Sequence, residues 1–395
     1  MAHTTNIDTL LTRGVDALFP SKEAFEKRLT SGKRMRIYVG FDPTAPQLHI
    51  GHALQLRKLK EFQDLGHEVI MLVGSFTGMI GDPTDKAAAR TQLTQKEVLK
   101  NAATYKKQAG KILSFSGKNA ARILFNHKWL SKMSFQDVVE LASHFTVQQM
   151  SERDMFDKRL KEGKPIHLHE FMYPLMQGYD SVEMDVDVEI GGSDQMFNML
   201  AGRTLMRAMK QKEKLVLTLK LLTNDEGKKM SKSEGGFIAL GDAPEDMFGK
   251  IMSMHDSMIL SYFELITDVP VEEIEGMRVA MNEGMNPRDM KVRLARKVVT
   301  MFHDAKAAEK ANEHFEQVFS RKEFPEDMPT FKATGGMQVI DVLEKTELVS
   351  SRSEARRLIS QNAIKLDGVV VKTPELMVEE GVLQRGKRQF VKLEK

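Results

Sequence analysis

The sequence has no cysteine among its 395 residues. This absence excludes disulfide bonds, thiol catalysis and thiolate zinc sites, and it fits a reducing compartment, so we expect a cytoplasmic protein. No stretch approaches the roughly 18 consecutive apolar residues that a membrane span needs, so we expect no membrane association. The first six residues, MAHTTN, lack the basic and apolar segments of a signal peptide.

What the sequence does contain is typical of a folded globular chain, with 41% hydrophobic and 29% charged residues. A chain of this length exceeds what one hydrophobic core usually holds, so we expect two or three domains. The formal net charge of +3 is too small to indicate a nucleic-acid partner. Any such partner has to be inferred from local basic sites.

Short apolar runs typical of β-strands alternate with helical patterns over about the first 230 residues. Runs at 35–41 and 69–74 flank a helical pattern that ends at Gly66. Such a β-α-β unit implies a parallel sheet. Further strands are expected at 121–125, 186–190 and 215–219. We therefore expect an α/β domain with a parallel sheet over residues 1–235.

The strand-like runs stop near Gly241, and helical patterns with clear starts follow, such as Asn286-Pro287 ahead of a helix. We expect an α-helical domain over residues 236–323. The polar stretch 324–336 contains two prolines and two glycines, which predicts a linker over 324–334. Residues 335–395 are expected to form a third, small α+β domain.

This last domain has two local signals. The segment 351–359 predicts a helix on which Arg352 and Arg356, four residues apart, share a face. The dipeptide Asp367-Gly368 between β-forming residues predicts a hairpin.

The segment Leu48-His49-Ile50-Gly51-His52 lies between the first strand and the first helix. Ligands gather at the carboxyl ends of parallel strands, and a helix N-terminus attracts phosphates. Both histidines can donate a hydrogen bond to a phosphate or ribose oxygen, and Gly51 lets a ligand approach the backbone. An isolated pair of this kind can equally cap a helix or bind a metal, although no third metal ligand lies nearby.

A second segment, GKKMSKSEGG at 227–236, is a lysine-rich loop flanked by glycines, which on its own can be a solvated surface loop. Together the two segments resemble the HIGH and KMSKS signatures of the class I aminoacyl-tRNA synthetases, letter for letter and in the family order. No GxxxxGK[ST] loop offers a rival phosphate site. The resemblance implies a Rossmann-like catalytic domain that uses ATP with Mg²⁺, and no tightly bound protein-ligated metal.

In this family the amino-acid carboxylate displaces pyrophosphate at the α-phosphorus of ATP, so positioning and charge stabilisation suffice. The resemblance implies catalytic roles for Thr44, His49, His52, Lys229 and Lys232. It implies ATP contacts by Gly40, Asp42, Thr44, His49, Gly51, His52, Gly192, Asp194, Lys229, Lys232 and Ser233. Lys86 and Arg90 resemble positions that assist pyrophosphate or the tRNA end, or they are solvated helix residues.

Three further segments, 38–44, 78–83 and 173–180, followed by 191–195, resemble the tyrosyl enzymes of the class. The resemblance implies that Tyr38 and Asp180 bind the substrate phenol, that Asp82, Tyr173 and Gln177 bind its α-amino group, and that Gln195 lies alongside. Positions 173, 177 and 180 share one helix face. Without the other segments, Tyr173 and Gln177 read as ordinary helix residues. The expected activity is formation of tyrosyl-adenylate and transfer of tyrosine to tRNA(Tyr).

Residues from about 335 resemble the S4 RNA-binding domain, so Arg352, Arg356, Arg357 and Lys365 are expected to contact tRNA phosphates. A module for protein contact is the alternative. The resemblance also implies a homodimer. Three other functions stay open: a tryptophanyl enzyme, which the phenol-binding pair disfavours, a regulatory RNA-binding protein on a retired synthetase fold, and a nucleotidyltransferase with an HxGH motif.

Overall fold

The computed structural model describes residues 6–82, 93–223, 237–317, 328–333, 336–386 and 389–395. The chain divides into two compact units, Met1–Ala308 and Glu309–Lys395. None of the helices in the described ranges combines the length and apolar character that crossing a bilayer requires.

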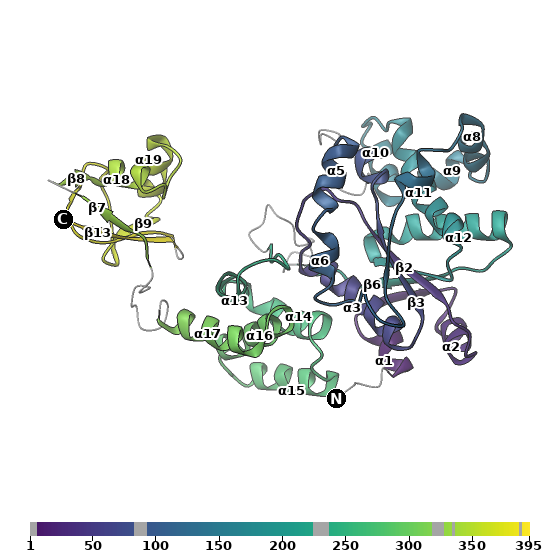
Figure 1. Ribbon diagram of the computed structural model, residues 1–395, viewed down its shortest axis with the longest axis horizontal. Helices are drawn as coiled ribbons and strands as arrows, with labels where there is room; N and C mark the ends of the chain where they lie inside the picture. The colour runs from purple at the N-terminus through teal and green to yellow at the C-terminus, as the bar shows by residue number, and fades with distance from the viewer. Residues whose placement is uncertain (1–5, 83–92, 224–236, 318–327, 334–335, 387–388) are drawn as a thin grey trace. The chain divides into compact units, whose positions relative to one another are not determined.

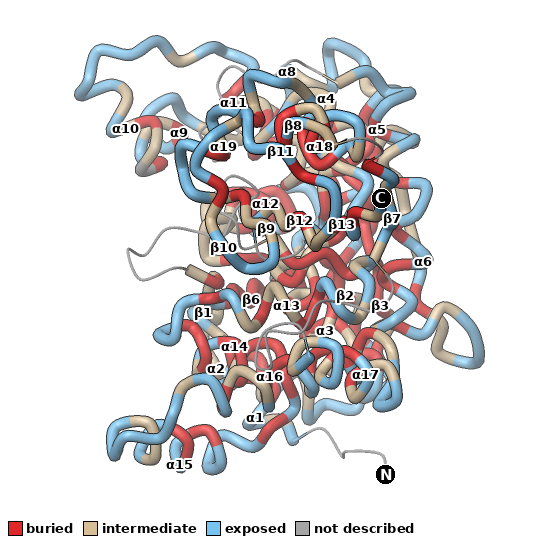
Figure 2. The backbone as a smooth tube through the Cα atoms, turned by 90° about the vertical axis from the view of Figure 1, so that its left-hand side faces the viewer, coloured by how far each residue is buried: buried red, intermediate tan, exposed pale blue. Residues whose placement is uncertain are grey.

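A six-stranded sheet in the order β1-β6-β5-β2-β3-β4 forms the centre of the first unit (Figure 1). Its strands are β1 (Val15–Phe19), β2 (Arg36–Phe41), β3 (Glu68–Val73), β4 (Arg122–Phe125), β5 (Val188–Gly192) and β6 (Leu215–Leu219). All neighbours from β6 to β4 are parallel, which confirms the predicted parallel sheet. Every residue of β5 and β6 is buried, as Figure 2 shows for the centre of this unit.

β1 was not predicted, and it pairs with β6 in the antiparallel direction at the edge of the sheet. Its pairing is irregular between Val15 and Ala17. There the hydroxyl of Thr218 accepts the N–H of Ala17 at 2.9 Å in place of a backbone carbonyl. A short, partly exposed edge strand has no continuous apolar run, which is why the sequence pattern did not reveal it.

The strand order reverses between β5 and β2. The crossover from β2 to β3 runs through α3 (Ile50–Asp64) and the one from β5 to β6 runs through α12 (Met196–Lys210), in opposite directions along the sheet. Because both crossovers are expected to be right-handed, the two helices cover opposite faces (Figure 1). In folds of this kind ligands bind outside the carboxyl ends of the strands at such a reversal, which here are β2 and β5.

Further helices surround the sheet. They are α1 (Ile7–Thr12), α2 (Lys22–Thr30), α4 (Thr77–Ile80), α5 (Gln95–Ala102), α6 (Tyr105–Ala109), α7 (His127–Leu130), α8 (Phe135–Ser143), α9 (Val147–Ser151), α10 (Asp154–Lys161) and α11 (Leu168–Glu183). Helices α8, α9, α11 and α12 share one apolar cluster that includes Leu141, Met150, Leu175 and Leu205. This cluster fixes α11, which carries three of the predicted site residues.

The predicted helical segment follows β6. It contains α13 (Pro244–Met252), α14 (Ile259–Ile266), α15 (Val271–Asn282), α16 (Pro287–Phe302) and α17 (Ala305–Phe315). Helix α16 begins as predicted: Asn286 caps it by accepting the N–H of Arg288 at 3.0 Å, and Pro287 occupies the first turn. Its inward face buries Met290, Leu294 and Val298.

Two arginines join this helical segment to the sheet. Arg13 donates to the backbone carbonyls of Phe263, Glu264 and Thr267 at 2.9 to 3.1 Å. Arg57, on α3, donates to the carbonyl of Thr267 at 2.9 Å. The last carbonyls of a helix have no partner within it and lie at the negative end of its dipole, so cations stabilise them. The two side chains therefore cap the carboxyl end of α14.

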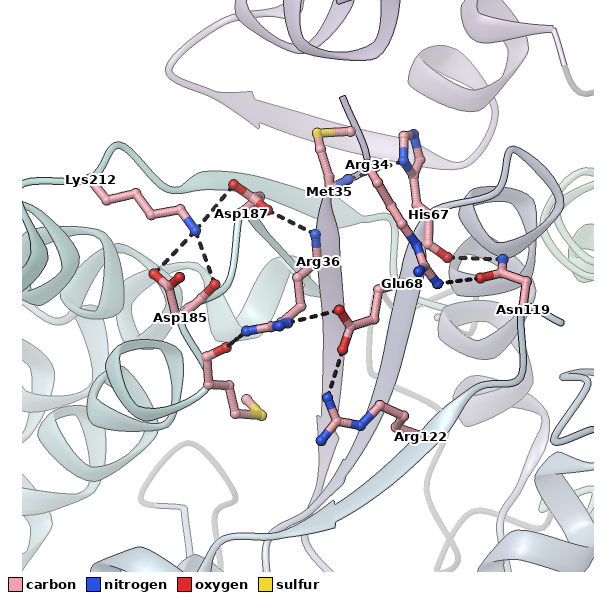
Figure 3. Close-up of polar contacts among 11 residues, drawn as sticks. Arg34, Met35, Arg36, His67, Glu68, Asn119, Arg122, Asp185, Asp187 and Lys212 are labelled. Atoms are coloured by element: carbon pink, nitrogen blue, oxygen red, sulfur yellow. Dashed lines mark hydrogen bonds and ion pairs between the residues drawn. The ribbon is translucent and has the colours of Figure 1, made fainter. Parts of the chain in front are cut away.

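Polar side chains connect the edge of the sheet where the parallel strands begin (Figure 3). Glu68, at the start of β3, accepts from Arg122 at 2.7 Å and lies 3.2 Å from Nε of Arg36. Asp187, just before β5, accepts the N–H of Arg36 at 2.8 Å and lies 3.2 Å from Nζ of Lys212. The charges at this edge bind one another and hold four strands in register.

The second unit contains a five-stranded sheet in the order β10-β9-β12-β13-β7, a two-stranded sheet and two helices. Its elements are β7 (Thr330–Lys332), β8 (Met337–Gln338), α18 (Val339–Lys345), α19 (Arg352–Ser360), β9 (Ile364–Leu366), β10 (Val369–Val370), β11 (Met377–Val378), β12 (Gly381–Arg385) and β13 (Gln389–Glu394). β7 lies within the stretch predicted as a linker and pairs with β13. The domain boundaries stay a prediction.

The predicted helix and hairpin of this unit are confirmed. Ser351 caps α19 by accepting the N–H of Glu354. Asp367 and Gly368 join β9 to β10 with φ angles of 48° and 80°, the left-handed conformations that a two-residue hairpin turn requires. Oδ1 of Asp367 also accepts the N–H of Val382 at 2.7 Å, which ties the turn to β12.

Candidate functional site

The predicted ATP residues Gly40 and Asp42 lie at the end of β2, and Gly192 and Asp194 lie at the end of β5. Gly40 is exposed although its strand is central, and a Cβ there would have no atom nearer than 3.9 Å. At Gly192 a Cβ would lie 2.4 Å from Oδ1 of Asp194, so this glycine makes room for the aspartate. The structure thus brings these four residues to the carboxyl ends of β2 and β5, where the strand order reverses.

Asp42 is an acceptor for side chains from two other elements. Its Oδ1 accepts from the hydroxyl of Thr77 at 2.7 Å, and its Oδ2 accepts from the hydroxyl of Tyr173 at 2.8 Å. Gly74, after β3, leaves space for this carboxylate, because a Cβ there would lie 1.9 Å from Oδ1. Burial, then the charges of Asp42 and Asp82, raise the pKa of Tyr173 well above its usual range, so its hydroxyl keeps its proton.

Asp82 lies at the same edge and is held by two donors. Nη2 of Arg153 lies 3.1 Å from Oδ1 of Asp82, and Nε2 of Gln195 donates to Oδ2 at 2.6 Å. Arg153 is 5% exposed, and its guanidinium lies 5.6 and 5.7 Å from the ring centres of Phe156 and Phe197. Asp82 is half-buried, and its carboxylate oxygens are acceptors of the kind that an ammonium group requires.

Gln177 has its amide oriented by two buried side chains. Its Nε2 donates to Oε1 of Glu189 at 3.1 Å, and its Oε1 accepts from Nδ2 of Asn198 at 3.0 Å. The same Nδ2 donates to Oε1 of Gln195 at 2.9 Å. Because Glu189 can only accept, the amide nitrogen of Gln177 faces it and the amide oxygen faces away. Asn198 occupies one lone pair of that oxygen, and we expect the second lone pair to accept from a cationic ligand.

Tyr38, on β2, is 1% exposed, and its hydroxyl lies 3.0 Å from Oγ of Ser181. Asp180, its predicted companion, instead accepts from Nε1 of Trp129 at 2.7 Å and from Nδ2 of Asn126 at 3.1 Å. Burial raises the pKa of Asp180 well above its usual range, and the hydrogen bonds from Asn126 and Trp129 oppose that shift. Burial, followed by the charges of Glu189 and Asp180, raises the pKa of Tyr38.

The two histidines of the first signature cap α3. Nδ1 of His49 accepts the N–H of Gly51 at 3.1 Å, and Nδ1 of His52 accepts the N–H of His49 at 3.0 Å. An Nδ1 that accepts places the ring proton on Nε2, so each ring has a donor at its other nitrogen. A Cβ on Gly51 would lie 3.0 Å from the His49 ring, so this glycine admits the imidazole itself. Capping and phosphate binding are therefore compatible roles.

The residues that follow the second signature lie against the first. The N–H of Ile50 donates to the carbonyl of Ile238 at 3.0 Å, and the N–H of Leu240 donates to the carbonyl of Leu48 at 2.9 Å. The ring of Phe237 lies 5.4 Å from that of His49, measured between ring centres. Thr44 is exposed at the same edge. The predicted residues Lys86, Arg90, Lys229, Lys232 and Ser233 lie outside the described residues.

The four predicted RNA-binding residues lie on α19 and β9 of the second unit. Arg356 and Arg357 are exposed. Lys365 is half-buried, and within the described part of the chain no side chain of these three forms a hydrogen bond or an ion pair. Arg352 differs, because it forms ion pairs with Asp341 and with Glu344, the latter at 3.3 Å.

Comparisons with known proteins assign the chain to a family. A model described as class I tRNA synthetases (W and Y) matches residues 30–320, and an S4 domain model matches residues 339–383. The tyrosine–tRNA ligase of Carboxydothermus hydrogenoformans is 45% identical over 97% of this chain and 96% of the relative. Tyrosine–tRNA ligase 2 of Vibrio cholerae is 46% identical over 97% of each chain. The chain belongs to the tyrosine–tRNA ligase family of class I aminoacyl-tRNA synthetases.

Solved structures of this family share the fold. A C-terminally truncated mitochondrial tyrosyl-tRNA synthetase of Coccidioides posadasii is 26% identical, with a TM-score of 0.62 over 78% of this chain and 90% of that one. A tyrosyl-tRNA synthetase of Archaeoglobus fulgidus, solved with L-tyrosine, has a TM-score of 0.60 at 21% identity over 78% and 100% of the two chains. The predicted synthetase fold is confirmed.

In this member of the tyrosine–tRNA ligase family, seven residues that the sequence patterns did not select also form hydrogen bonds or ion pairs around the predicted tyrosine site. They are Asn126, Trp129, Arg153, Ser181, Glu189, Asn198 and Lys214. A polar residue inside an apolar strand run was the available signal, since Glu189 interrupts β5 and Lys214 directly precedes β6. Within the described ranges, no group of three or more histidine, aspartate or glutamate side chains is placed to hold a metal ion.

Proposed function

We propose that this chain activates L-tyrosine with ATP and transfers the tyrosyl group to the 3′ end of tRNA(Tyr). One observation carries the proposal beyond family membership. Six polar residues expected to bind tyrosine all take part in hydrogen bonds between side chains of different elements of the first unit. They are Tyr38, Asp82, Tyr173, Gln177, Asp180 and Gln195.

The two ends of a tyrosine molecule require different partners. We assign the phenol to Tyr38 and Asp180, since both are buried and a phenol can accept from one and donate to the other. We assign the α-ammonium group to Asp82, Tyr173 and Gln177, with Gln195 alongside. Asp82 supplies charge, while the oxygens of Tyr173 and Gln177 supply acceptors. Phenylalanine would leave the phenol partners buried and unmatched, which disfavours it.

In this assignment ATP binds next to the α-carboxylate of the bound tyrosine. Gly40, Asp42, Thr44 and the His49 and His52 donors face its phosphates and base. Gly192 and Asp194 accept its ribose hydroxyls. The tyrosine carboxylate attacks the α-phosphorus, an oxygen–phosphorus bond forms, and the bond to pyrophosphate breaks. Lys229, Lys232 and Ser233 are proposed to stabilise the phosphate charge, and Mg²⁺ to enter with ATP, held largely by phosphates and water.

The RNA partner is assigned to local basic sites. Arg356, Arg357 and Lys365 are proposed to contact tRNA phosphates, together with Arg352 once its carboxylate partners are displaced. The helical segment 236–323 is proposed to contact the anticodon. Lys86 and Arg90 are proposed to assist pyrophosphate or the tRNA end. A chain without cysteine that charges tRNA suits the reducing cytoplasm, where we propose that it works.

We also propose a homodimer. Four large apolar side chains are exposed on the neighbouring helices α8, α9 and α11: Phe135 (84%), Val139 (53%), Val147 (74%) and Leu168 (82%). Such a patch on one side of the molecule is typical of an interface, and an isologous dimer covers it with the same patch. Leu168→Asp should convert the dimer into monomers in sedimentation experiments. A Lys118→Asp control should leave the sedimentation unchanged.

Pyrophosphate exchange into ATP, measured with each of the twenty amino acids, tests the activation step. Exchange should depend on tyrosine. Lys232→Ala should lower the exchange rate more than the affinity for tyrosine, whereas Lys118→Ala, an exposed lysine away from the site, should change neither. Exchange driven by tryptophan, or by no amino acid, would contradict the proposal.

Removal of residues 324–395, which contain both sheets of the second unit, tests the transfer step. A chain that ends at residue 323 loses β7 together with the strand that it pairs with, so the cut leaves no unpaired partner in a sheet. It should retain tyrosine-dependent exchange and lose most tRNA charging. Equal charging by the shortened and full chains would contradict the RNA-binding role.

A further inference from the structure

A buried lysine lies behind the predicted phenol site. Lys214, just before β6, is 0% exposed, and its Nζ donates to Oγ of Ser181 at 2.9 Å. The same Nζ is paired with the carboxylate of Glu189, which is 2% exposed. The Ser181 hydroxyl in turn lies 3.0 Å from that of Tyr38. An ammonium group, a hydroxyl and a phenol therefore form a continuous chain that ends at the predicted site.

The fold makes room for this ammonium group at the contact between α11 and α12. A Cβ at Gly202, on α12, would lie 2.4 Å from Nζ of Lys214 and 3.0 Å from Oγ of Ser181. A Cβ at Gly178, on α11, would lie 3.1 Å from the backbone nitrogen of Gly202. Two helices that meet through glycines leave a space that any larger residue would close.

A charge buried here is costly to the fold. Burial lowers the pKa of Lys214, and the neighbouring Glu189 carboxylate opposes that shift. Replacing a buried ion pair by apolar residues of similar volume is often neutral or stabilising, so stability alone does not explain this pair. The hydrogen bond from Lys214 to Ser181 connects the ion pair to Tyr38.

The chain of hydrogen bonds has a direction. An ammonium group only donates, so it occupies a lone pair of the Ser181 oxygen and leaves the serine proton for another acceptor, such as the oxygen of Tyr38. The Tyr38 hydroxyl has a second neighbour in Glu189, and Lys214 also pairs with that carboxylate, so the ammonium group competes with Tyr38 for it. At the far side of the site, Asp180 accepts from Asn126 and Trp129 and offers further lone pairs. A phenol placed between the two sides can accept from Tyr38 and donate to Asp180.

We propose that Lys214 and Ser181 are positioning residues for substrate selection: Lys214 donates to Ser181, Ser181 donates to the oxygen of Tyr38, and the Tyr38 hydroxyl proton is thereby directed at the substrate phenol. The inference rests on the proposed function and deepens it. Phenylalanine has no oxygen to accept this proton, so the directed donor discriminates between the two amino acids.

Ser181→Ala tests this relay in the full-length chain, with pyrophosphate exchange measured for tyrosine and for phenylalanine. The variant should lower kcat/KM for tyrosine about tenfold, the value of one buried hydrogen bond, and leave that for phenylalanine unchanged. The loss should appear in KM rather than kcat, because the phenol is held equally before and during the reaction. Thr218→Val, which removes a different buried hydroxyl, on β6, is the matched control and should leave the ratio unchanged.

A double-mutant cycle shows whether Ser181 acts through Tyr38. In a Tyr38→Phe background, Ser181→Ala should cause no further change in the tyrosine to phenylalanine ratio. Additive losses would overturn the relay, as would equal losses for both amino acids or an unchanged ratio. A second variant, Lys214→Met combined with Glu189→Gln, removes the ammonium group without leaving a buried charge unpaired and should shift the ratio in the same direction.

The two levels of the proposal fail in different ways. If the unaltered chain shows no tyrosine-dependent exchange, the proposed function is wrong and the relay falls with it. If the unaltered chain activates tyrosine and Ser181→Ala preserves the ratio, the function stands and the relay alone is refuted.

Discussion

The two units use cations in opposite ways. Lys214, in the first unit, is fully buried and donates to Ser181 and Glu189. Arg352, in the second unit, has a side chain that is 59% exposed and forms its ion pairs with Asp341 and Glu344 at the surface. A buried cation has no water to replace a lost partner, whereas an exposed one exchanges partners at little cost.

This contrast suits the different ligands that we propose for the two units. A small amino acid has to be distinguished from a near copy, which requires fixed, desolvated polar groups. A phosphate backbone is recognised by charge, and exposed guanidinium groups that exchange their partners are adequate. Substitutions in the first unit should therefore have large and specific effects, and those in the second unit small and salt-dependent ones.

The largest effect is expected for Lys214→Met, which leaves Glu189 buried without its cation. It should lower the free energy of unfolding by about 3–5 kcal/mol, measured in urea. Lys212→Met is the matched control, since that side chain is 27% exposed and one of its two carboxylate partners, Asp185, is 55% exposed. Equal losses for the two variants would remove the contrast between buried and exposed cations.

Tyr38→Phe combined with Asp180→Asn should reduce the preference for tyrosine over phenylalanine by at least about a hundredfold, since two buried hydrogen bonds to the phenol are lost. The ratio of kcat/KM values in pyrophosphate exchange measures this. The control is Tyr262→Phe, because Tyr262 is a buried tyrosine of α14 that does not belong to the proposed phenol site. This variant should leave the ratio unchanged. A ratio unaffected by the double change would refute the phenol assignment.

Removing three cations of the second unit should have a smaller, general effect. Arg356→Ala with Arg357→Ala and Lys365→Ala should raise KM for tRNA about tenfold and make the logarithmic salt dependence of binding shallower by about 2 to 3. Tyrosine-dependent exchange should stay at the level of the unaltered chain. A weakened activation step would indicate that these residues act on the fold rather than on RNA.

Arg352→Ala should have the smallest effect, a loss of stability below about 1 kcal/mol in urea unfolding, because exposed ion pairs are screened by water. High salt should reduce the loss further. A loss of stability as large as that of Lys214→Met would show that solvent exposure does not determine how much these ion pairs contribute to the free energy of unfolding.

Local patterns in the sequence predicted the parts of the fold that local forces determine. The five parallel strands, the capped start of α16 and the Asp367-Gly368 turn each depend on residues next to one another in the chain. The spacing of Tyr173, Gln177 and Asp180 also placed all three on the helix side that meets the sheet.

The partners of these residues could not be predicted in the same way. Gln177 is oriented by Glu189 and Asn198, which come from a strand and a helix that follow it, and Asp180 is held by Asn126 and Trp129 from a segment about fifty positions earlier. Such contacts depend on tertiary packing and leave no periodic signal. Likewise, the sequence did not indicate that the space at Gly51, predicted to let a ligand approach, also admits the His49 ring.

The arginine contacts at the end of α14 affect how this chain can be divided. Arg13 and Arg57 belong to the segment before β3, yet their guanidinium groups end on the carbonyls of residues 263–267. A fragment cut after β6 would retain both cations and lose all of those acceptors. The smallest fragment that contains the six-stranded sheet and folds on its own should therefore extend through α14. A protease cut between β6 and α13 should leave two pieces that stay associated until both unfold.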